Sequence, residues 1–199
     1  MLDVKNHILV RDNALDSNIC DNLIELFENN PQLYKQGISG TNDGGKNTVE
    51  KVKKSTDIGI DNSFLQHPDF SQPVKLLIDC LHDTTDKYVE KFPELTQVPN
   101  WGLKAQFNLQ RYLPEEGFFA WHCEYNPHND YTNKHVLAWM IYLNTVTDGG
   151  GTEFSNNYGS VQAVKGRCVI WPAYWTHFHR GIVSPTQTKY IATGWYGFM

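Results

Sequence analysis

Two short segments, far apart in the sequence, combine residue types that could bind one metal ion. The first is Trp121-His122-Cys123-Glu124, in which a histidine and a carboxylate are two residues apart. On a β-strand this spacing puts His122 and Glu124 on one face and Cys123 on the other. The second is Thr176-His177-Phe178-His179, whose two histidines also share a face. One histidine from the second segment would complete a two-His, one-carboxylate set with open positions for a divalent metal, and spacing alone does not choose between them.

Simpler interpretations compete with this one. An isolated His-x-Glu pair is more often an ordinary hydrogen-bonded pair, because so short a motif is degenerate. His122-Cys123-Glu124 also fits the start of a zinc deaminase signature, but the sequence has no downstream Pro-Cys-x-x-Cys. Residues 40–46 nearly form a phosphate-binding loop, but Asn47 stands where Ser or Thr is required. His128 and His135 flank a polar loop and are given no role.

A lysine at the start of an apolar segment adds context to the second motif. Lys189 comes ten residues after His179 and precedes the aromatic run Tyr190–Tyr196. A lysine that points into an apolar barrel needs an anionic partner. The alternative is that Lys189 faces solvent, or reaches it from the beginning of the strand.

Two helices are expected in the first half of the chain. The first spans residues 16–30, begins at Asp16 or Ser17 and has an apolar face formed by Ile19, Leu23, Ile24 and Phe27. The second begins at Pro73 and ends at Phe92-Pro93, with an apolar stripe suited to packing.

The segment between the two helices has no periodicity. Gly37 to Ser55 is rich in Gly, Asn, Thr and Lys, which is typical of a mobile loop or a hairpin with a flexible tip. Its basic run, Lys51–Lys54, is expected to be a solvated face, with steering of an acidic substrate as the alternative.

From about Trp101 onward the pattern changes to short alternating segments separated by turn residues, which predicts strands. Gly149-Gly150-Gly151 is expected to be a tight turn. Six to eight short strands without interleaved helical periods favour a sandwich or jelly roll over an alternating parallel sheet. The strands are expected at residues 103–112, 117–124, 135–144, 160–164, 167–172 and 188–198.

Composition excludes several classes of protein. The 199 residues are 40% hydrophobic, which suits one globular domain. The formal net charge of -5 makes nucleic acid an unlikely partner, and no apolar run is long enough to span a membrane. Four separated cysteines and the lack of a signal peptide predict reduced thiols and a cytoplasmic location, which suits a ferrous ion. The sequence sets no oligomeric state.

The order and spacing of these motifs resemble the iron(II) and 2-oxoglutarate-dependent dioxygenases, and within them the prolyl 4-hydroxylase-like branch. The resemblance covers roughly residues 101–198. It rests on Gln110-Arg111-Tyr112, His122-Cys123-Glu124, Met140-Ile141-Tyr142-Leu143-Asn144, Gly149-Gly150-Gly151-Thr152-Glu153-Phe154, and His179 through Lys189 to Trp195.

The resemblance implies a role for each matching residue. His122, Glu124 and His179 would hold Fe(II), and Lys189 would bind the distal carboxylate of 2-oxoglutarate. The ten-residue offset to Lys189 favours His179 over His177 as the ligand. Three aromatic residues would line the co-substrate pocket: Tyr142, expected to hydrogen-bond the same carboxylate, Tyr112 and Trp195. The alternative for Tyr142 is a core tyrosine, and aromatic residues in strands, such as Tyr112 and Trp195, more often belong to the core.

Two positions depart from the family pattern. Glu124 stands where the family usually has Asp, so its longer side chain must fold back or its strand must lie farther from the metal. Pro185 falls later after the distal histidine than is usual, beside the expected substrate entrance.

The expected fold is therefore α+β and mainly β: a double-stranded β-helix, or jelly roll, backed by N-terminal helices. We interpret residues 1–199 as a single domain, with helical support and a flexible loop at 1–100 and the catalytic core at 101–199. The loop at about 37–55 is a hypothetical substrate lid.

The resemblance implies an enzyme that uses Fe(II), 2-oxoglutarate and O2, forms succinate and CO2, and hydroxylates a peptidyl proline. It also allows for ascorbate. No catalytic residue beyond the metal ligands is implied. The expected partner is a peptide or protein that contains proline. The alternatives are a dioxygenase acting on another amino acid or a small metabolite, and a non-catalytic jelly-roll binding module.

Overall fold

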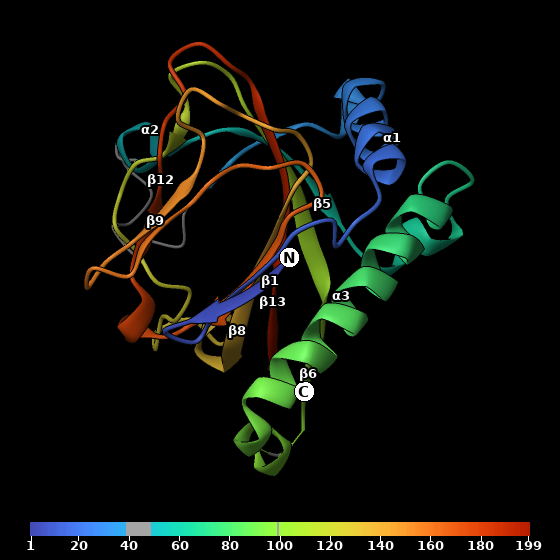
Figure 1. Ribbon diagram of the computed structural model, residues 1–199. Helices are drawn as coiled ribbons and strands as arrows, with labels where there is room; N and C mark the ends of the chain where they lie inside the picture. Colours follow the sequence, from blue (N-terminus) through green and yellow to red (C-terminus); the bar gives the residue numbers. More distant parts are fainter. Residues whose placement is uncertain (39–48, 99) are drawn as a thin grey trace.

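Three antiparallel sheets, one large and two small, frame the described part of the chain (Figure 1). The computed structural model describes residues 1–38, 49–98 and 100–199. The larger, eight-stranded sheet has the order β1-β2-β11-β8-β13-β6-β5-β3. Its strands are β1 (Leu2–Lys5), β2 (Ile8–Arg11), β3 (Lys35–Gln36), β5 (Thr56–Ile60), β6 (Trp101–Tyr112), β8 (His135–Tyr142), β11 (Cys168–Pro172) and β13 (Lys189–Phe198).

The two smaller sheets face the inner surface of the larger sheet. A three-stranded sheet has the order β10-β9-β12, and a two-stranded sheet pairs β4 with β7. Their strands are β4 (Lys53–Lys54), β7 (Gly117–Phe118), β9 (Thr152–Phe154), β10 (Gly159–Val161) and β12 (His179–Gly181). The turn before β9 uses Gly149 and Gly150 at φ 78° and 73°, as expected for the glycine run.

Alternation along β8 shows how one sheet serves two cores. Leu137, Trp139 and Ile141 pack in the cluster that includes the helices, whereas Ala138, Met140 and Tyr142 pack in the cluster inside the jelly roll. Every one of these side chains is buried. A strand covered on both faces therefore carries an almost continuous apolar run, because each face meets its own core.

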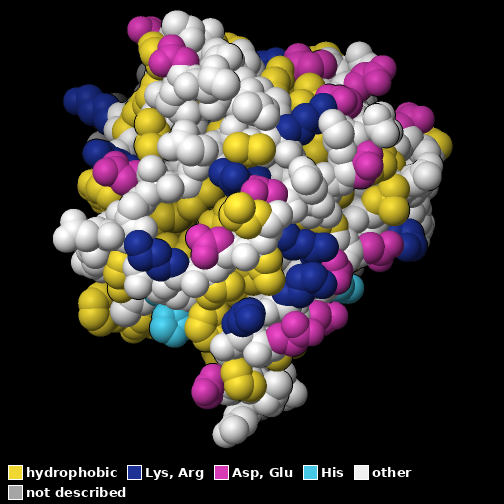
Figure 2. All heavy atoms as spheres, in the orientation of Figure 1, with side chains coloured by type: hydrophobic (Ala, Val, Ile, Leu, Met, Phe, Trp, Pro, Cys, Tyr) yellow, Lys and Arg dark blue, Asp and Glu magenta, His cyan; other side chains and the backbone are white. Residues whose placement is uncertain are grey.

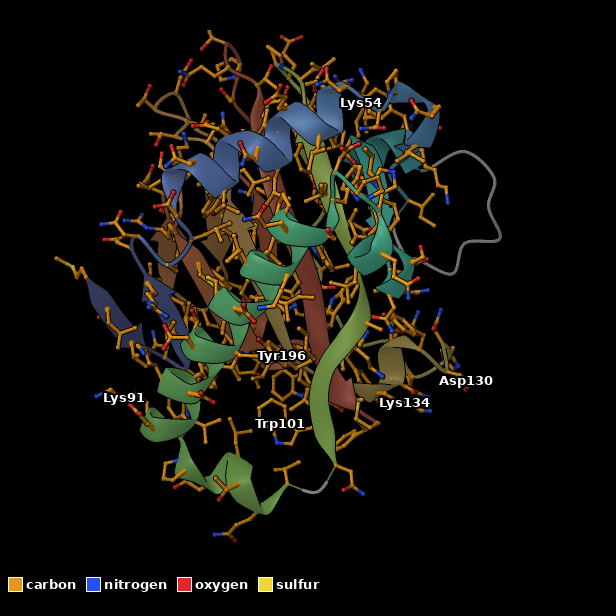
Figure 3. The ribbon with its side chains drawn as sticks, turned by 90° about the vertical axis from the view of Figure 1, so that its right-hand side faces the viewer. Lys54, Lys91, Trp101, Asp130, Lys134 and Tyr196 are labelled. Carbon is orange, nitrogen blue, oxygen red and sulfur yellow. The ribbon has the colours of Figure 1, made fainter. Side chains whose placement is uncertain are left out.

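The helices α1 (Ser17–Glu28) and α3 (Ser71–Lys91) cover the outer face of the large sheet (Figure 1). The Asp16 side chain accepts a hydrogen bond from the Asn18 backbone N–H and so begins α1. Figure 3 shows α3 lying across the sheet, with Trp101 and Tyr196 beneath it, their ring centroids 5.9 Å apart. These contacts pack the helices against the large sheet.

The remaining elements are short. They are α2 (Val49–Val52) and the 3-10 turns η1 (Pro31–Leu33), η2 (Asn62–Gln66), η3 (Pro93–Gln97), η4 (Thr132–Lys134) and η5 (Trp175–His177). Among the described residues, no helix combines the length and apolar character needed to cross a membrane.

The jelly roll backed by helices is confirmed, and so are both predicted helices, although α3 begins at Ser71, two residues before Pro73. The predicted strand 117–124 is wrong beyond Phe118, because the chain there leaves regular strand pairing and forms an isolated backbone bridge to β12 at His122. Within its described residues, the predicted support at 1–100 also contributes five strands, from β1 to β5.

The segment 37–55, predicted as a loop and a hypothetical lid, is only partly described. Its residues 39–48 lie outside the described residues. Its second part forms α2 and β4. Lys53 is buried, so the prediction of a solvated basic face is wrong at that position.

Candidate active site

His122 and His179 are brought together by a backbone bridge. His179 begins β12, and β12 is anchored on β9 with His179 opposite Phe154. The His122 N–H donates to the His179 carbonyl at 3.0 Å, and the His179 N–H donates back at 2.9 Å. The Glu124 N–H donates to the carbonyl of Ala173 at 3.0 Å. These bonds between main-chain atoms, and not a continuous strand, fix where the three side chains start.

The three side chains converge on one point. Glu124 Oε1 lies 3.2 Å from His179 Nε2 and 3.4 Å from His122 Nε2. One ligand atom from each residue lies within 4.8 Å of the other two. Two ligands bound at about 2.1 Å and at right angles to each other are about 3.0 Å apart. The set therefore fits one metal ion bound on one side, with positions left open.

The outer nitrogens of both imidazoles are already used. Nδ1 of His122 lies 3.0 Å from the Ala120 carbonyl, and Nδ1 of His179 lies 3.0 Å from the His177 carbonyl. A carbonyl oxygen only accepts, so each Nδ1 carries the hydrogen and each Nε2 turns its lone pair towards Glu124. A metal cation between them would satisfy two lone pairs and a carboxylate that face one another, which is the arrangement of metal-ligating histidines.

Burial and charge shift the pKa values in a direction that suits metal binding. Burial lowers the pKa of His122, and the neighbouring His179 lowers it further. Burial alone would raise the pKa of Glu124, but the His122 and His179 imidazoles that face its carboxylate hold that pKa well below its usual range. At neutral pH the site therefore offers a carboxylate and a neutral imidazole, the forms that bind metals.

Aromatic rings hold the ligands in place. The Phe118 ring stacks on His122 with centroids 3.6 Å apart and an interplanar angle of 6°. Trp171 packs edge-on against His179 at 5.0 Å. Trp195 Nε1 donates to Glu124 Oε2 at 2.8 Å, which leaves Oε1 free to face the histidines. The ligand set is thus fixed in advance by its neighbours.

A cavity of about 800 Å³ opens over the ligand set. Figure 2 shows hydrophobic side chains gathered in a hollow left of centre, on the side where β9 and β12 lie in Figure 1. The residues lining the cavity include His122, Glu124, His179, Tyr112, Lys189 and Trp195, so six of the seven predicted site residues meet in one space.

Lys189 is the unusual member of this wall. It is 6% exposed, and burial lowers its pKa to about 8. Its Nζ lies 4.6 Å from the centroid of the Tyr112 ring. Within the described part of the chain, no hydrogen-bond acceptor or carboxylate pairs with Nζ. A buried ammonium without a counter-ion fits an anionic ligand such as the distal carboxylate of 2-oxoglutarate.

Tyr142 lies one layer behind the cavity. It is fully buried, and its hydroxyl pairs with Thr152 Oγ1 at 2.8 Å and donates to the Val161 carbonyl at 3.3 Å. Thr152 lines the cavity and Tyr142 does not. Thr152 therefore connects the Tyr142 hydroxyl to the cavity. The predicted direct contact of Tyr142 with the co-substrate stays a prediction.

His177 takes a different direction from His179. It lies in the turn η5, and its Nε2 is 2.8 Å from the Asn6 carbonyl while Nδ1 faces Thr176 Oγ1 at 2.9 Å. Both ring nitrogens of His177 are therefore hydrogen-bonded to atoms outside the ligand set, the Asn6 carbonyl and the Thr176 hydroxyl. The expected shared face fails because the chain turns before β12 begins at His179.

His135, given no role from the sequence, has one in the structure. Its Nδ1 donates to the Glu124 carbonyl at 3.0 Å, and its ring stacks on Trp195 with centroids 4.8 Å apart. It therefore supports both the main chain and the side-chain partner of Glu124. As a single histidine at the start of a strand, it carried no signal in the sequence.

A buried polar network was also overlooked. It joins Lys53, Ser55 and Asp57 to Gln110 and Tyr112 along the cavity wall. A signal was present, because polar residues at 53, 55 and 57 have the period of a strand and so share one face.

Comparison with known proteins agrees with this site. Residues 107–197 match the family model described as the 2OG-Fe(II) oxygenase superfamily. Procollagen-lysine,2-oxoglutarate 5-dioxygenase 1 of Rattus norvegicus is 32% identical over 110 residues, which is 52% of this chain and 14% of that protein. The protein of the same name from Gallus gallus is 26% identical over 183 residues, or 87% of this chain and 21% of that protein. This chain thus spans only a small part of these relatives' length.

Solved structures share the fold. A Pseudomonas putida prolyl-4-hydroxylase has a TM-score of 0.68 at 14% identity, covering 97% of this chain and 93% of that one. A Trichoplax adhaerens prolyl hydroxylase, in complex with a hypoxia inducible factor oxygen degradation domain peptide fragment, has a TM-score of 0.71 at 16% identity, covering 97% and 84%. At these identities the likeness establishes the architecture.

Proposed function

We propose that this chain, whose residues 107–197 form a 2OG-Fe(II) oxygenase domain, hydroxylates a prolyl residue of a polypeptide. The observation that carries the proposal is one cavity containing two features: the converging set His122, Glu124 and His179, and a buried ammonium, Lys189, with no counter-ion among the described residues. The first suits Fe(II), and the second suits a dicarboxylate co-substrate.

His122, Glu124 and His179 would hold Fe(II). When bound, Fe(II) with 2-oxoglutarate and O2 supplies the oxidising power to hydroxylate an aliphatic C–H bond, while 2-oxoglutarate becomes succinate and CO2. The protein residues contribute position and shelter. Trp195 and the Ala120 and His177 carbonyls keep the three ligand atoms facing inward before any ligand arrives.

Lys189 would bind the distal carboxylate of 2-oxoglutarate by a charge-assisted hydrogen bond. Its burial makes that bond strong, because little water competes for the ammonium. The Tyr112 ring, 4.6 Å from Nζ, favours the charged form. The co-substrate would thus be held at its far end by the Lys189 ammonium, which lines the same cavity as the ligand set.

Two observations favour prolyl over lysyl substrates. The solved structures above include prolyl hydroxylases, one of them bound to a peptide. In addition, a lysyl ammonium needs an acidic partner, and the acidic residues lining the described cavity are Asp57 and Glu124. Asp57 already accepts from Lys53 and Ser55, and Glu124 faces the histidines. Neither carboxylate is left for a substrate cation.

Lysyl hydroxylation is the second candidate, because the relatives of highest sequence similarity reported above carry that name. A dioxygenase acting on a free amino acid or a small metabolite, and a non-catalytic binding module, are the remaining alternatives. Ascorbate dependence also stays a prediction.

Succinate production from 2-oxoglutarate under air with Fe(II) tests the proposal, with two matched peptides that differ only in a central proline or lysine. We expect succinate to rise with the proline peptide, and that peptide to gain one oxygen atom by mass spectrometry. The His179→Ala variant gives the background. A gain of oxygen on the lysine peptide alone would transfer the assignment to lysyl hydroxylation. Succinate no higher than background, together with no binding of 2-oxoglutarate, would favour the binding module.

A further inference from the structure

A buried carboxylate outside the candidate ligand set is linked to both halves of the site through its hydrogen-bond partners. Asp57 on β5 accepts hydrogen bonds from Ser55 Oγ at 2.7 Å, Lys53 Nζ at 2.8 Å and Gln110 Nε2 at 2.9 Å. All four side chains are buried, and Lys53 is only 3% exposed. Burying this many polar groups in a cavity wall is costly unless all are paired, so the network is specific in its geometry.

One arm of the network leads to the ligand His122. Lys53 on β4 pairs with Phe118 on β7, and its Nζ lies 6.0 Å from the centroid of the Phe118 ring. Phe118 in turn stacks on His122 at 3.6 Å. The Val52 carbonyl also accepts from the Phe119 N–H at 2.8 Å. The strands β4 and β7 pair over only two residues each. The hydrogen bond from Lys53 on β4 to Asp57 on β5 therefore also attaches this pair of strands to the large sheet.

The other arm leads to Lys189. A carboxylate only accepts, so Gln110 must turn its Nε2 towards Asp57 and its Oε1 towards Tyr112. That Oε1 accepts from the Tyr112 hydroxyl at 2.7 Å. The Tyr112 ring is thereby held at 4.6 Å from Lys189 Nζ, and the two residues are direct partners across β6 and β13.

The direction of these bonds has a chemical consequence. The Tyr112 hydroxyl donates its one hydrogen to Gln110 Oε1, so only its lone pairs are available to a ligand in the cavity. A carboxylate ligand beside Tyr112 would therefore take its donor from Lys189, and Tyr112 would act through its ring.

We propose that Asp57 is a positioning residue shared by the metal site and the co-substrate pocket. Through Lys53 it holds the wall that carries Phe118 and His122, and through Gln110 it holds Tyr112 against Lys189. The inference rests on the proposed function, since it takes His122 and Lys189 as the groups that bind metal and co-substrate.

Three variants separate the two arms. Lys53→Met removes the ammonium of the metal arm, and Gln110→Met removes both polar atoms of the co-substrate arm. Asp57→Asn keeps the shape of the hub but removes its charge and one acceptor oxygen, so at least one of its donors loses a partner. The matched control is Lys54→Met, because Lys54 is the next residue on β4, is exposed and pairs with Glu116 at 3.4 Å (Figure 3).

Two affinities are measured by calorimetry on the full chain without O2: Mn²⁺ as the metal probe, and 2-oxoglutarate at saturating Mn²⁺. We expect Lys53→Met to weaken Mn²⁺ binding about tenfold with 2-oxoglutarate affinity within about twofold of the wild type. Gln110→Met should weaken 2-oxoglutarate binding about tenfold and leave Mn²⁺ affinity within about twofold of the wild type. Asp57→Asn should weaken both, and Lys54→Met neither. If Lys53→Met does not fold, Phe118→Leu tests the same arm by removing the stacking on His122.

Melting temperatures in a chelator provide the structural readout. Variants that melt earlier but keep both affinities, or a loss shared by Lys54→Met, would overturn the role of Asp57. Wild-type protein that binds neither Mn²⁺ nor 2-oxoglutarate would overturn the proposed function instead.

Discussion

Replacing Lys189 with methionine should stabilise the ligand-free protein while removing its co-substrate. Burial lowers the pKa of Lys189 from 10.5 to about 8, so holding its charge at neutral pH costs about 3 kcal/mol of folding free energy. Methionine has a similar length and no charge. The substitution also removes the contact between Lys189 Nζ and the Tyr112 ring, at 4.6 Å, which reduces the gain in stability by about 1 kcal/mol. The net gain of about 2 kcal/mol corresponds to a rise in Tm of about 4–8 °C for a chain of this size.

The same substitution leaves the distal carboxylate of 2-oxoglutarate without its cation. Removing one partner of a buried charge pair costs roughly 2–4 kcal/mol, or about a 30- to 1000-fold loss of affinity. A gain in stability joined to a loss of binding marks a residue kept for function.

The pKa of Lys189 also predicts how both quantities change with pH. The folded protein releases this proton near pH 8 and the unfolded chain near pH 10.5, so the unfolded chain binds more protons between these values. The destabilisation by Lys189 is therefore complete below pH 8, shrinks as the pH rises and is absent above pH 10.5. Affinity for 2-oxoglutarate should fall about tenfold per pH unit above pH 8, because the carboxylate binds the protonated form.

Thermal unfolding without ligand and calorimetry with 2-oxoglutarate on the Mn²⁺-loaded protein measure the two effects from pH 6.5 to 9.5. Lys75→Met is the control, since Lys75 is exposed, pairs with Asp79 and lies far from the cavity. A Lys189→Met protein that is less stable than the wild type, or that binds 2-oxoglutarate as tightly, would refute the reasoning.

Further predictions concern the ligand set, and each is checked by Mn²⁺ titration. His179→Ala should abolish measurable Mn²⁺ binding, whereas His177→Ala should keep it within about threefold; equal losses would reject His179 as the ligand. Glu124→Asp should weaken Mn²⁺ binding about tenfold, because the shorter side chain cannot face both histidines and still reach Trp195 Nε1. Trp195→Phe should weaken it to a similar degree, and it should add nothing further in the Glu124→Asp background; additive losses would show that the two residues act separately.

The parts of the fold that were predictable are those with sustained periodicity. The apolar face of α1 and the long strands β6 and β13 each repeat a pattern over many residues. The missed strands β9 and β12 have three residues each, too few to show an alternation. Their pairing depends on turns and on contacts with distant segments, so local sequence carries little information about them.

The same limit applies to the site. The residue types and spacing of His122, Glu124 and His179 predicted a group that the fold brings together in space, although His122 lies on an irregular segment and not on the predicted strand. The period-2 pattern of Lys53 and Asp57 was visible, but whether such a face meets water or a cavity depends on which strand covers it. Here Gln110 on β6 lies directly opposite Asp57, a pairing that only the folded chain defines.

The glutamate at position 124 shows how this chain adapts a longer ligand. An extra methylene adds a rotatable bond, which must be fixed if the carboxylate is to stay between two histidines. The structure supplies two constraints: Trp195 Nε1 binds Oε2 at 2.8 Å, and His135 Nδ1 binds the Glu124 carbonyl at 3.0 Å. Because His135 also stacks on Trp195, one rigid unit holds both the main chain and the side chain of Glu124. The geometry of the carboxylate is therefore set by its neighbours, which makes glutamate as well defined here as a shorter aspartate would be.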